Sequence, residues 1–175
     1  MATVEQTTLL RPVEPPVPDD GLGDLPVRDL WKFRVEGVAV PQGSMVAFVS
    51  ATTGRAMMKP NNEKALKAWR RHVAQSASAA RPPWLREPAD GSIYVALAFV
   101  RERGEDYLSD GVTLRKGARR FPDTAPDIDK LTRAMLDALT AVAFTNDARV
   151  VTCLATKRYA EKGERAHVDV DIGFL

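Results

Sequence analysis

The chain has 175 residues, enough for one domain with a sizeable core, and its 45% hydrophobic and 27% charged residues are typical of a globular protein. No apolar run approaches the roughly 18 residues of a membrane span, and the N-terminus lacks a basic and then apolar leader, so we expect neither a span nor a secretion signal. A single cysteine, Cys153, excludes an internal disulfide and fits a reducing cytoplasm.

The net charge of +2 is unevenly distributed along the chain. Residues 1–30 hold six acids and two bases, which leaves +6 for the remaining 145 residues. A basic body is compatible with a polyanionic partner. Residues 1–29 also contain five of the twelve prolines without sustained periodicity, so we expect a disordered acidic tail before a domain over residues 30–175. The tail is either a dispensable leader or an arm that contacts a partner.

The first elements after the tail are a strand and a hairpin. Alternating side chains predict a strand over residues 31–40, which the turn Pro41-Gln42-Gly43-Ser44 ends. Residues 45–50 and 55–59 then have the pattern of two hairpin arms. Lys59, at the end of the second arm, could reach a phosphate, although a solvated lysine is the simpler interpretation.

A helix is predicted next, capped by Asn61 or Asn62 and running to about Ala80. Its expected buried stripe is Ala65, Trp69, Val73 and Ala77. Basic residues, Arg70 among them, occupy its other faces. They form either a solvated surface or a surface that faces DNA.

Residues 93–100 predict a strand that is largely buried on both faces. The polar segment over residues 101–125 that follows is too long for an ordinary loop. It contains the densest basic cluster of the chain, with Arg115, Lys116, Arg119 and Arg120. The cluster either guides a DNA backbone toward the residues that follow or belongs to a mobile solvated loop.

The last two strands are predicted over residues 149–159 and 166–174. The second strand contains Asp169 and Asp171, an aspartate pair two residues apart. Its alternation places both aspartates, together with His167, on a solvent-exposed face. We therefore assign this pair no chemistry.

The rest of the chain is organised around residues 126–149. Asp127 and Asp129 follow a proline, where an extended backbone would direct both carboxylates to one side and Ile128 into the core. Apolar residues at spacings of three and four then predict a helix with an apolar stripe of Ile128, Leu131, Met135, Leu139 and Val142. Asp147 lies in a tight connection after this helix, where it could fold back toward the first two aspartates.

Clustered carboxylates repel one another by roughly 4 kcal/mol per pair at 4 Å and an effective dielectric of 20. A divalent cation offsets this repulsion, and Mg²⁺ prefers hard oxygen ligands and phosphate. The residues therefore indicate a Mg²⁺ site that handles a phosphate ester. The alternatives are helix capping for one of the first two aspartates and a turn role for Asp147. No glycine-rich phosphate loop, zinc-type pattern or nucleophile with a matching base competes with this interpretation.

The runs P-D-I-D-K-L-x-R-x-x-L-D-A-L-T and F-T-N-D-A-R-V-V resemble the signature of RusA-type Holliday junction resolvases of bacteria and phages. The resemblance is clear from Pro126 to the C-terminus and fainter through the turn at residues 41–44 and around Trp69. It implies that Asp127, Asp129 and Asp147 bind Mg²⁺, or Mn²⁺ in its place, and are essential for cutting.

The resemblance also bears on two basic residues. The family commonly has a catalytic lysine at the position of Arg133. Arginine keeps the positive charge but stays protonated, so Arg133 is expected to stabilise phosphate charge, and Lys130 could share that task. The alternative is a structural role, in which Arg133 pairs with Asp129 and Asp137 in an exposed ladder of salt bridges along the helix.

Together these observations predict a two-layer α+β fold, a mixed or antiparallel sheet of about four strands with two helices packed on it. The resemblance implies a cytoplasmic homodimeric endodeoxyribonuclease that resolves four-way junctions by paired nicks in recombination, repair or phage DNA processing, without a membrane or nucleotide cofactor. Two alternatives stay open. One is a nuclease of the same fold that acts on other branched DNA, and the other is a junction-binding protein with impaired catalysis.

Overall fold

The structure, a computed structural model, describes residues 27–104 and 113–175. Most of the expected tail lies outside these residues. The elements follow in the order β1 (Asp29–Glu36), β2 (Met45–Val49), β3 (Ala56–Pro60), α1 (Glu63–Ala79), β4 (Ile93–Arg101), α2 (Ile128–Leu139), the 3-10 helix η3 (Asp147–Arg149), β5 (Val150–Tyr159) and β6 (His167–Phe174).

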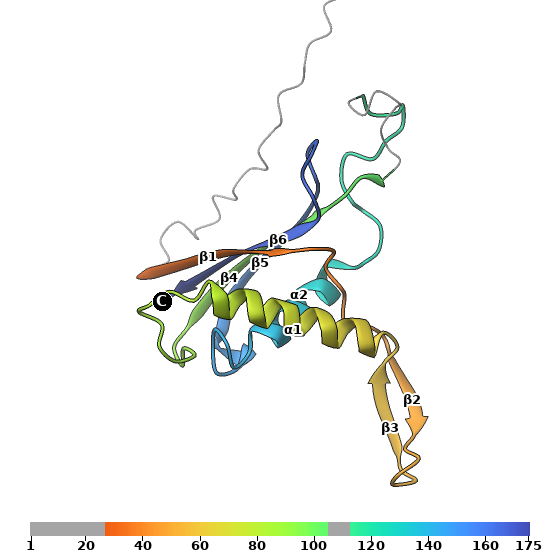
Figure 1. Cartoon of the computed structure of the whole chain (residues 1–175), viewed down its shortest axis with the longest axis vertical. Coiled ribbons are helices and arrows are strands. Elements are labelled where there is room, and N and C mark those ends of the chain that lie inside the picture. Colours follow the sequence, from red (N-terminus) through yellow and green to blue (C-terminus); the bar gives the residue numbers. More distant parts are fainter. Residues whose placement is uncertain (1–26, 105–112) are drawn as a thin grey trace, which may run out of the picture.

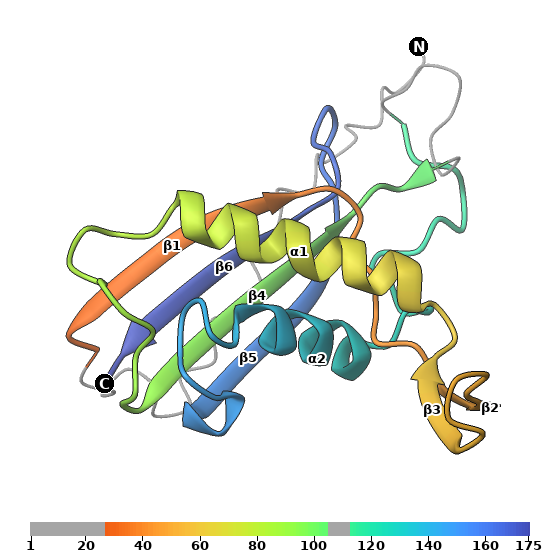
Figure 2. The ribbon, with the colours of Figure 1, turned by 60° about the horizontal axis from the view of Figure 1, so that its bottom comes forward.

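The main sheet has four strands in the order β1-β6-β4-β5. Strand β6 is antiparallel to both of its neighbours, whereas β4 and β5 are parallel. Helices α1 and α2 lie side by side on one face of this sheet (Figure 2). This arrangement confirms the predicted mixed sheet with two helices. No helix in residues 27–104 and 113–175 is long and apolar enough to cross a membrane.

The core lies between the sheet and the two helices. One face of β4 (Ile93, Val95, Leu97 and Phe99) is buried. On the other face Val100 is buried and the remaining residues are partly buried, so the strand is more completely covered on the side of the helices. The buried stripe of α1 is Leu66, Trp69, Val73 and Ala77. Ala65, expected in this stripe, is exposed, because the helix turns Leu66 toward the sheet.

Two other side chains lie in environments that differ from those predicted. Ile128 is 36% exposed, because the chain becomes helical at this residue and the alternation of an extended strand no longer applies. His167 is 2% exposed rather than solvated, since its ring contacts the Arg165 carbonyl and Asp169 at the start of the central strand β6. Asp169 itself pairs with Arg34 of β1 at 2.7 Å, in keeping with a structural role.

Strands β2 and β3 form a separate two-stranded sheet that projects from the body beyond the start of α1 (Figure 1). We call this element the apolar hairpin. Five of its side chains are between 40% and 69% exposed: Met45, Val46, Val49, Met57 and Met58. An isolated two-stranded sheet is marginally stable in water. A cluster of exposed apolar side chains of this kind is typical of a surface that binds a partner.

The turn between β5 and β6 is closed by an ion pair with two hydrogen bonds. Arg158 donates from Nη1 and Nη2 to the two carboxylate oxygens of Glu164, at 2.7 and 2.6 Å. The Glu161 N–H donates to the same carboxylate at 2.7 Å. The bonds from Arg158 above all lower the pKa of Glu164 from 4.5 to about 2.

Because the folded pKa of Glu164 lies below its unfolded value, the stability it contributes is complete above pH 4.5 and is lost as the pH falls to about 2. We expect Glu164→Gln to lower the free energy of unfolding by about 1–2 kcal/mol near neutral pH, an effect moderated by the exposure of Arg158. The difference should shrink at low pH. Urea denaturation across this pH range measures it.

Glu63→Gln is the matched control, because Glu63 pairs with Lys59 only at 3.7 Å on an exposed surface. This variant should differ little from the native protein at any pH. A loss for Glu164→Gln that stayed constant down to pH 2 would show that the ion pair is not its cause.

Candidate active site at the start of helix α2

Asp127 is the N-cap residue of α2, with an extended backbone at φ −67° and ψ 142°. Its side chain makes no capping hydrogen bond. The carboxylate instead lies 2.9 Å from Lys130 Nζ, with both side chains about half exposed. The hydrogen bond from Lys130 lowers the pKa of Asp127, and that of Lys130 is raised in return. Helix capping therefore does not account for the Asp127 carboxylate.

Asp129 and Asp147 line one surface hollow of about 470 Å³, which we call the carboxylate hollow. Asp129 belongs to the first turn of α2, and Asp147 is the first residue of η3. The remaining lining residues are Ile128, Thr132, Arg133, Leu136, Cys153 and Ala155. Partial desolvation raises the pKa of the Cys153 thiol, although the residue as a whole is exposed. Two of the three predicted aspartates thus share one hollow with Arg133.

Asp127 and Lys130 line a second hollow, of about 360 Å³, which we call the turn hollow. Its other lining residues are Pro41, Gln42, Gly43, Ser44, Asn61, Asn62, Ala125 and Pro126. The two hollows therefore lie on either side of the first turn of α2. The turn at residues 41–44, which the sequence indicated only as a backbone feature, contributes directly to this region.

The short turn that carries Asp147 is held by its neighbours. The Asn146 side chain accepts a hydrogen bond from the Ala148 N–H at 2.9 Å. Asp90, from the segment before β4, accepts a bond from Thr145 at 2.8 Å and pairs with Arg149 at 2.7 Å. Asp90 thus connects to both sides of Asp147. Sequence reasoning missed it, because a contact 55 residues away leaves no local pattern.

The segment that leads into Asp127 is anchored to the main sheet. Lys157 of β5 donates from Nζ to the carbonyls of Thr124 and Pro126, at 3.1 and 3.0 Å. Arg101 of β4 donates to the Ala125 carbonyl at 2.9 Å. Lys157 also contributes to the lowered pKa of Asp127 through its charge. These two residues, also missed from the sequence, position the start of α2.

Hard carboxylate oxygens are the ligands that Mg²⁺ prefers, so the three aspartates offer the type of ligand atom that this ion binds. Asp129 and Asp147 share a hollow, and Asp127 is engaged by Lys130 only through an exposed pair, whose rearrangement costs little. Within the described parts of the chain, no group of three or more His, Cys, Asp or Glu side chains is arranged to hold a metal ion.

Arg133 and Arg70 have different surroundings. Arg133 is exposed and pairs with no carboxylate among the described residues. Its expected partner Asp137 instead pairs with Arg70 of α1, which also donates to Gln42 at 2.7 Å. Arg70 therefore links both helices to the turn at residues 41–44. The salt-bridge ladder around Arg133 is not formed.

The predicted DNA contacts outside α1 and α2 are exposed. Lys59 pairs with Glu63 at 3.7 Å. In the polar segment over residues 101–125, Arg119 donates to the Asp123 carboxylate at 2.5 Å, and the Arg120 guanidinium lies 5.3 Å from the centroid of the Phe121 ring. Arg115 and Lys116 are exposed in the same segment. Residues 105–112, which belong to it, lie outside the described residues.

Comparison with known proteins matches residues 40–171 to the family described as endodeoxyribonuclease RusA. No curated protein matched the chain. The matched range contains the turn at residues 41–44, both helices, all three candidate aspartates and most of the main sheet. It spans well over half of the chain, and the chain therefore belongs to the RusA family of endodeoxyribonucleases.

Proposed function

We propose that this protein is a Mg²⁺-dependent, structure-selective endodeoxyribonuclease that resolves four-way DNA junctions by paired symmetric nicks, in recombination, repair or phage DNA processing. The observation that carries the proposal is the carboxylate hollow. Asp129 and Asp147 share it with Arg133, and Asp127 lies two residues away, in a chain of a DNA endonuclease family.

Asp129 and Asp147, joined by Asp127, would hold the divalent ion. When bound, such an ion activates water and stabilises charge on the scissile phosphate and the leaving oxygen. The ion pair with Lys130 is exposed, so Asp127 can leave it to act as a ligand at little cost. A 5′-phosphate and a 3′-hydroxyl would be the products.

Arg133 supplies a fixed positive charge in the same hollow. Its guanidinium remains protonated at any ordinary pH, so it stabilises phosphate charge and does not move protons. The start of α2 adds backbone N–H groups and the positive end of the helix dipole. Lys130, beside Asp127, would contact the phosphate backbone at the edge of the site.

Two other functions remain to be separated by experiment. A nuclease of the same fold could act mainly on other branched DNA, and a panel of junctions, flaps and linear duplexes distinguishes it. A junction-binding protein with impaired catalysis is favoured by one observation, the arginine at position 133. Tight junction binding without any cutting would identify that protein.

We expect Asp129→Asn and Asp147→Asn to lower the rate of junction nicking by at least about 10²-fold, because each removes a charged ligand from the carboxylate hollow. A labelled synthetic four-way junction with Mg²⁺ measures this rate, and chelation of the metal should abolish it. Asp171→Asn is the control, since Asp171 pairs with Lys32 on the sheet at 2.6 Å. Equal rates for Asp129→Asn and Asp171→Asn would refute the assignment.

Lys157 should act as a positioning residue. We expect Lys157→Met to lower kcat by about tenfold with little change in KM, because the segment before Asp127 loses two hydrogen bonds while the DNA surface is retained. The variant should also need more Mg²⁺ for half-maximal rate. Lys162→Met, in the exposed β5–β6 turn, is the control. A purely structural role would lower Tm and leave the Mg²⁺ requirement unchanged.

We also propose that two copies of the chain associate through the apolar hairpin. Two opposed cuts on a junction of near two-fold symmetry call for two identical sites, and an isologous interface provides them. Strands β2 and β3 contain a single charged residue, Lys59, and it pairs with Glu63. Apart from Lys59 and Arg55 of the connecting turn, this surface is uncharged and suits an equally apolar surface, that of a second copy.

The double variant Val49→Asn with Met58→Gln should shift the protein from dimer to monomer, because it replaces two exposed apolar side chains of the hairpin with neutral polar ones. We expect a decrease in dimer affinity of at least about tenfold in sedimentation velocity. Val151→Asn, at an exposed position of β5, is the control and should remain dimeric. A native protein that is monomeric at all concentrations would contradict the proposed interface.

A further inference from the structure

We infer that the turn hollow receives the nucleobase next to the scissile phosphate and that Asn61 recognises its edge. The inference rests on the proposed nuclease function and deepens it, since it assigns a source of sequence preference to one part of the site.

The turn hollow and the carboxylate hollow are lined by neighbouring residues of the first turn of α2. Asp127 and Lys130 line it, and Asp129, one residue before Lys130, lines the carboxylate hollow. A DNA strand whose phosphate lies over the start of α2 therefore presents a neighbouring nucleotide to the turn hollow. The space of about 360 Å³ is open to solvent on the surface and accommodates one planar base.

The lining of the turn hollow suits a base better than a phosphate. Pro41, Ala125 and Pro126 provide apolar surface for the face of a ring. The Asn61 amide and the Ser44 hydroxyl are neutral hydrogen-bonding groups. The one cation of the lining, Lys130, lies beside Asp127 at the edge next to the proposed phosphate position. Asparagine side chains recognise base edges, since an amide offers a donor and an acceptor side by side.

Gly43 brings the two asparagines over the turn. A Cβ atom added at Gly43 would lie 2.1 Å from Asn62 Oδ1 and 2.4 Å from Asn61 Oδ1. Any larger residue would therefore displace both amides. Glycine at this position lets the turn approach the start of α1 without displacing these amides.

The hollow is also held in place before any ligand binds. Asn62 donates from Nδ2 to the Pro41 carbonyl at 2.9 Å. The Gln42 N–H donates to the Lys130 carbonyl at 2.9 Å, and the Gln42 side chain accepts from Arg70. The turn is thus connected to both helices. Such preorganisation lowers the cost of ordering the site when a base binds.

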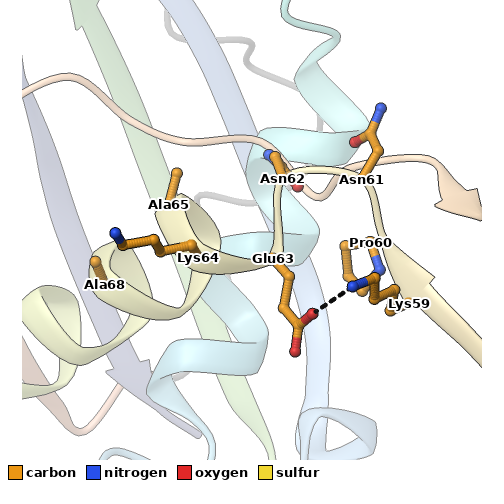
Figure 3. Close-up of a pocket in the computed structure, with 8 residues that line it drawn as sticks. All are labelled: Lys59, Pro60, Asn61, Asn62, Glu63, Lys64, Ala65 and Ala68. Carbon is orange, nitrogen blue, oxygen red and sulfur yellow. Dashed lines mark ion pairs between the residues drawn. The ribbon is translucent and has the colours of Figure 1, made fainter. Parts of the chain in front are cut away.

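Asn61 differs from Asn62 in having an available amide. Its side chain is exposed and forms no hydrogen bond with the described residues. Figure 3 shows Asn61 directed away from the Lys59–Glu63 pair, which lies on the other side of the chain. Its donor and acceptor are therefore available to a ligand in the turn hollow.

The test uses the full-length protein with Mg²⁺ and a pool of four-way junctions in which the nucleotides beside the crossover are randomised. Sequencing of the nicked strands gives the rate at each sequence. We expect the native protein to favour particular nucleotides next to the nick. Asn61→Ala should reduce the ratio between the best and worst nucleotide by about tenfold, chiefly by slowing the best one.

Two further variants sharpen the test. Asn61→Asp keeps the size of the side chain but loses its donor, so it should change which nucleotide is preferred. Lys64→Ala, on the nearby exposed surface of α1, should keep the native preference. Nicking by Asn61→Ala with the native preference would overturn the inference and leave the nuclease function standing. A native protein that nicks no junction would overturn both.

Discussion

The burial of one face of helix α2 is the constraint on which the rest of the site depends. Leu131, Met135 and Leu139 are at most 2% exposed against the sheet and α1. Each such side chain contributes roughly 1.5–3 kcal/mol relative to an exposed one, which fixes both the rotation and the depth of the helix. With that face fixed, Asp129, Thr132 and Arg133 have to point outward into the carboxylate hollow.

The start of α2 is fixed just as firmly by polar contacts. Lys157 and Arg101 donate hydrogen bonds to three backbone carbonyls of the segment before Asp127, and the Gln42 N–H donates to the Lys130 carbonyl. These bonds set where the extended chain becomes helical. The carboxylates are therefore held by a rigid framework while they themselves remain exposed. Exposure keeps the cost of gathering negative charges low until a cation binds.

Much of the fold and part of the site could be predicted from the sequence. The periodic patterns located all six strands and both helices of the described chain to within a few residues, since those patterns follow from which faces are buried. The order of the strands did not follow, because pairing is long-range: β5 is parallel to β4, and β6 lies between β4 and β1.

In the site, local spacing singled out the aspartates, and the structure brings Asp129 and Asp147 into one hollow. The direction of the Asp127 side chain could not be predicted from the sequence, because it depends on the residue at which the helix begins. Asp90, Lys157 and Arg101 were missed for a related reason. Each acts on a segment distant in sequence through a backbone or side-chain contact that has no periodicity.

The separation of two hollows by a single helical turn has a physical logic for an enzyme that cuts DNA. Strong charges bind every phosphate equally, so a surface that carries them positions the backbone without distinguishing bases. Recognition of a base depends on directional hydrogen bonds to its edge, which neutral amide and hydroxyl groups beside an apolar surface can supply. In this chain Arg133 lies in the carboxylate hollow, whereas the neutral Asn61 and Ser44 line the turn hollow on the other side of the first turn of α2.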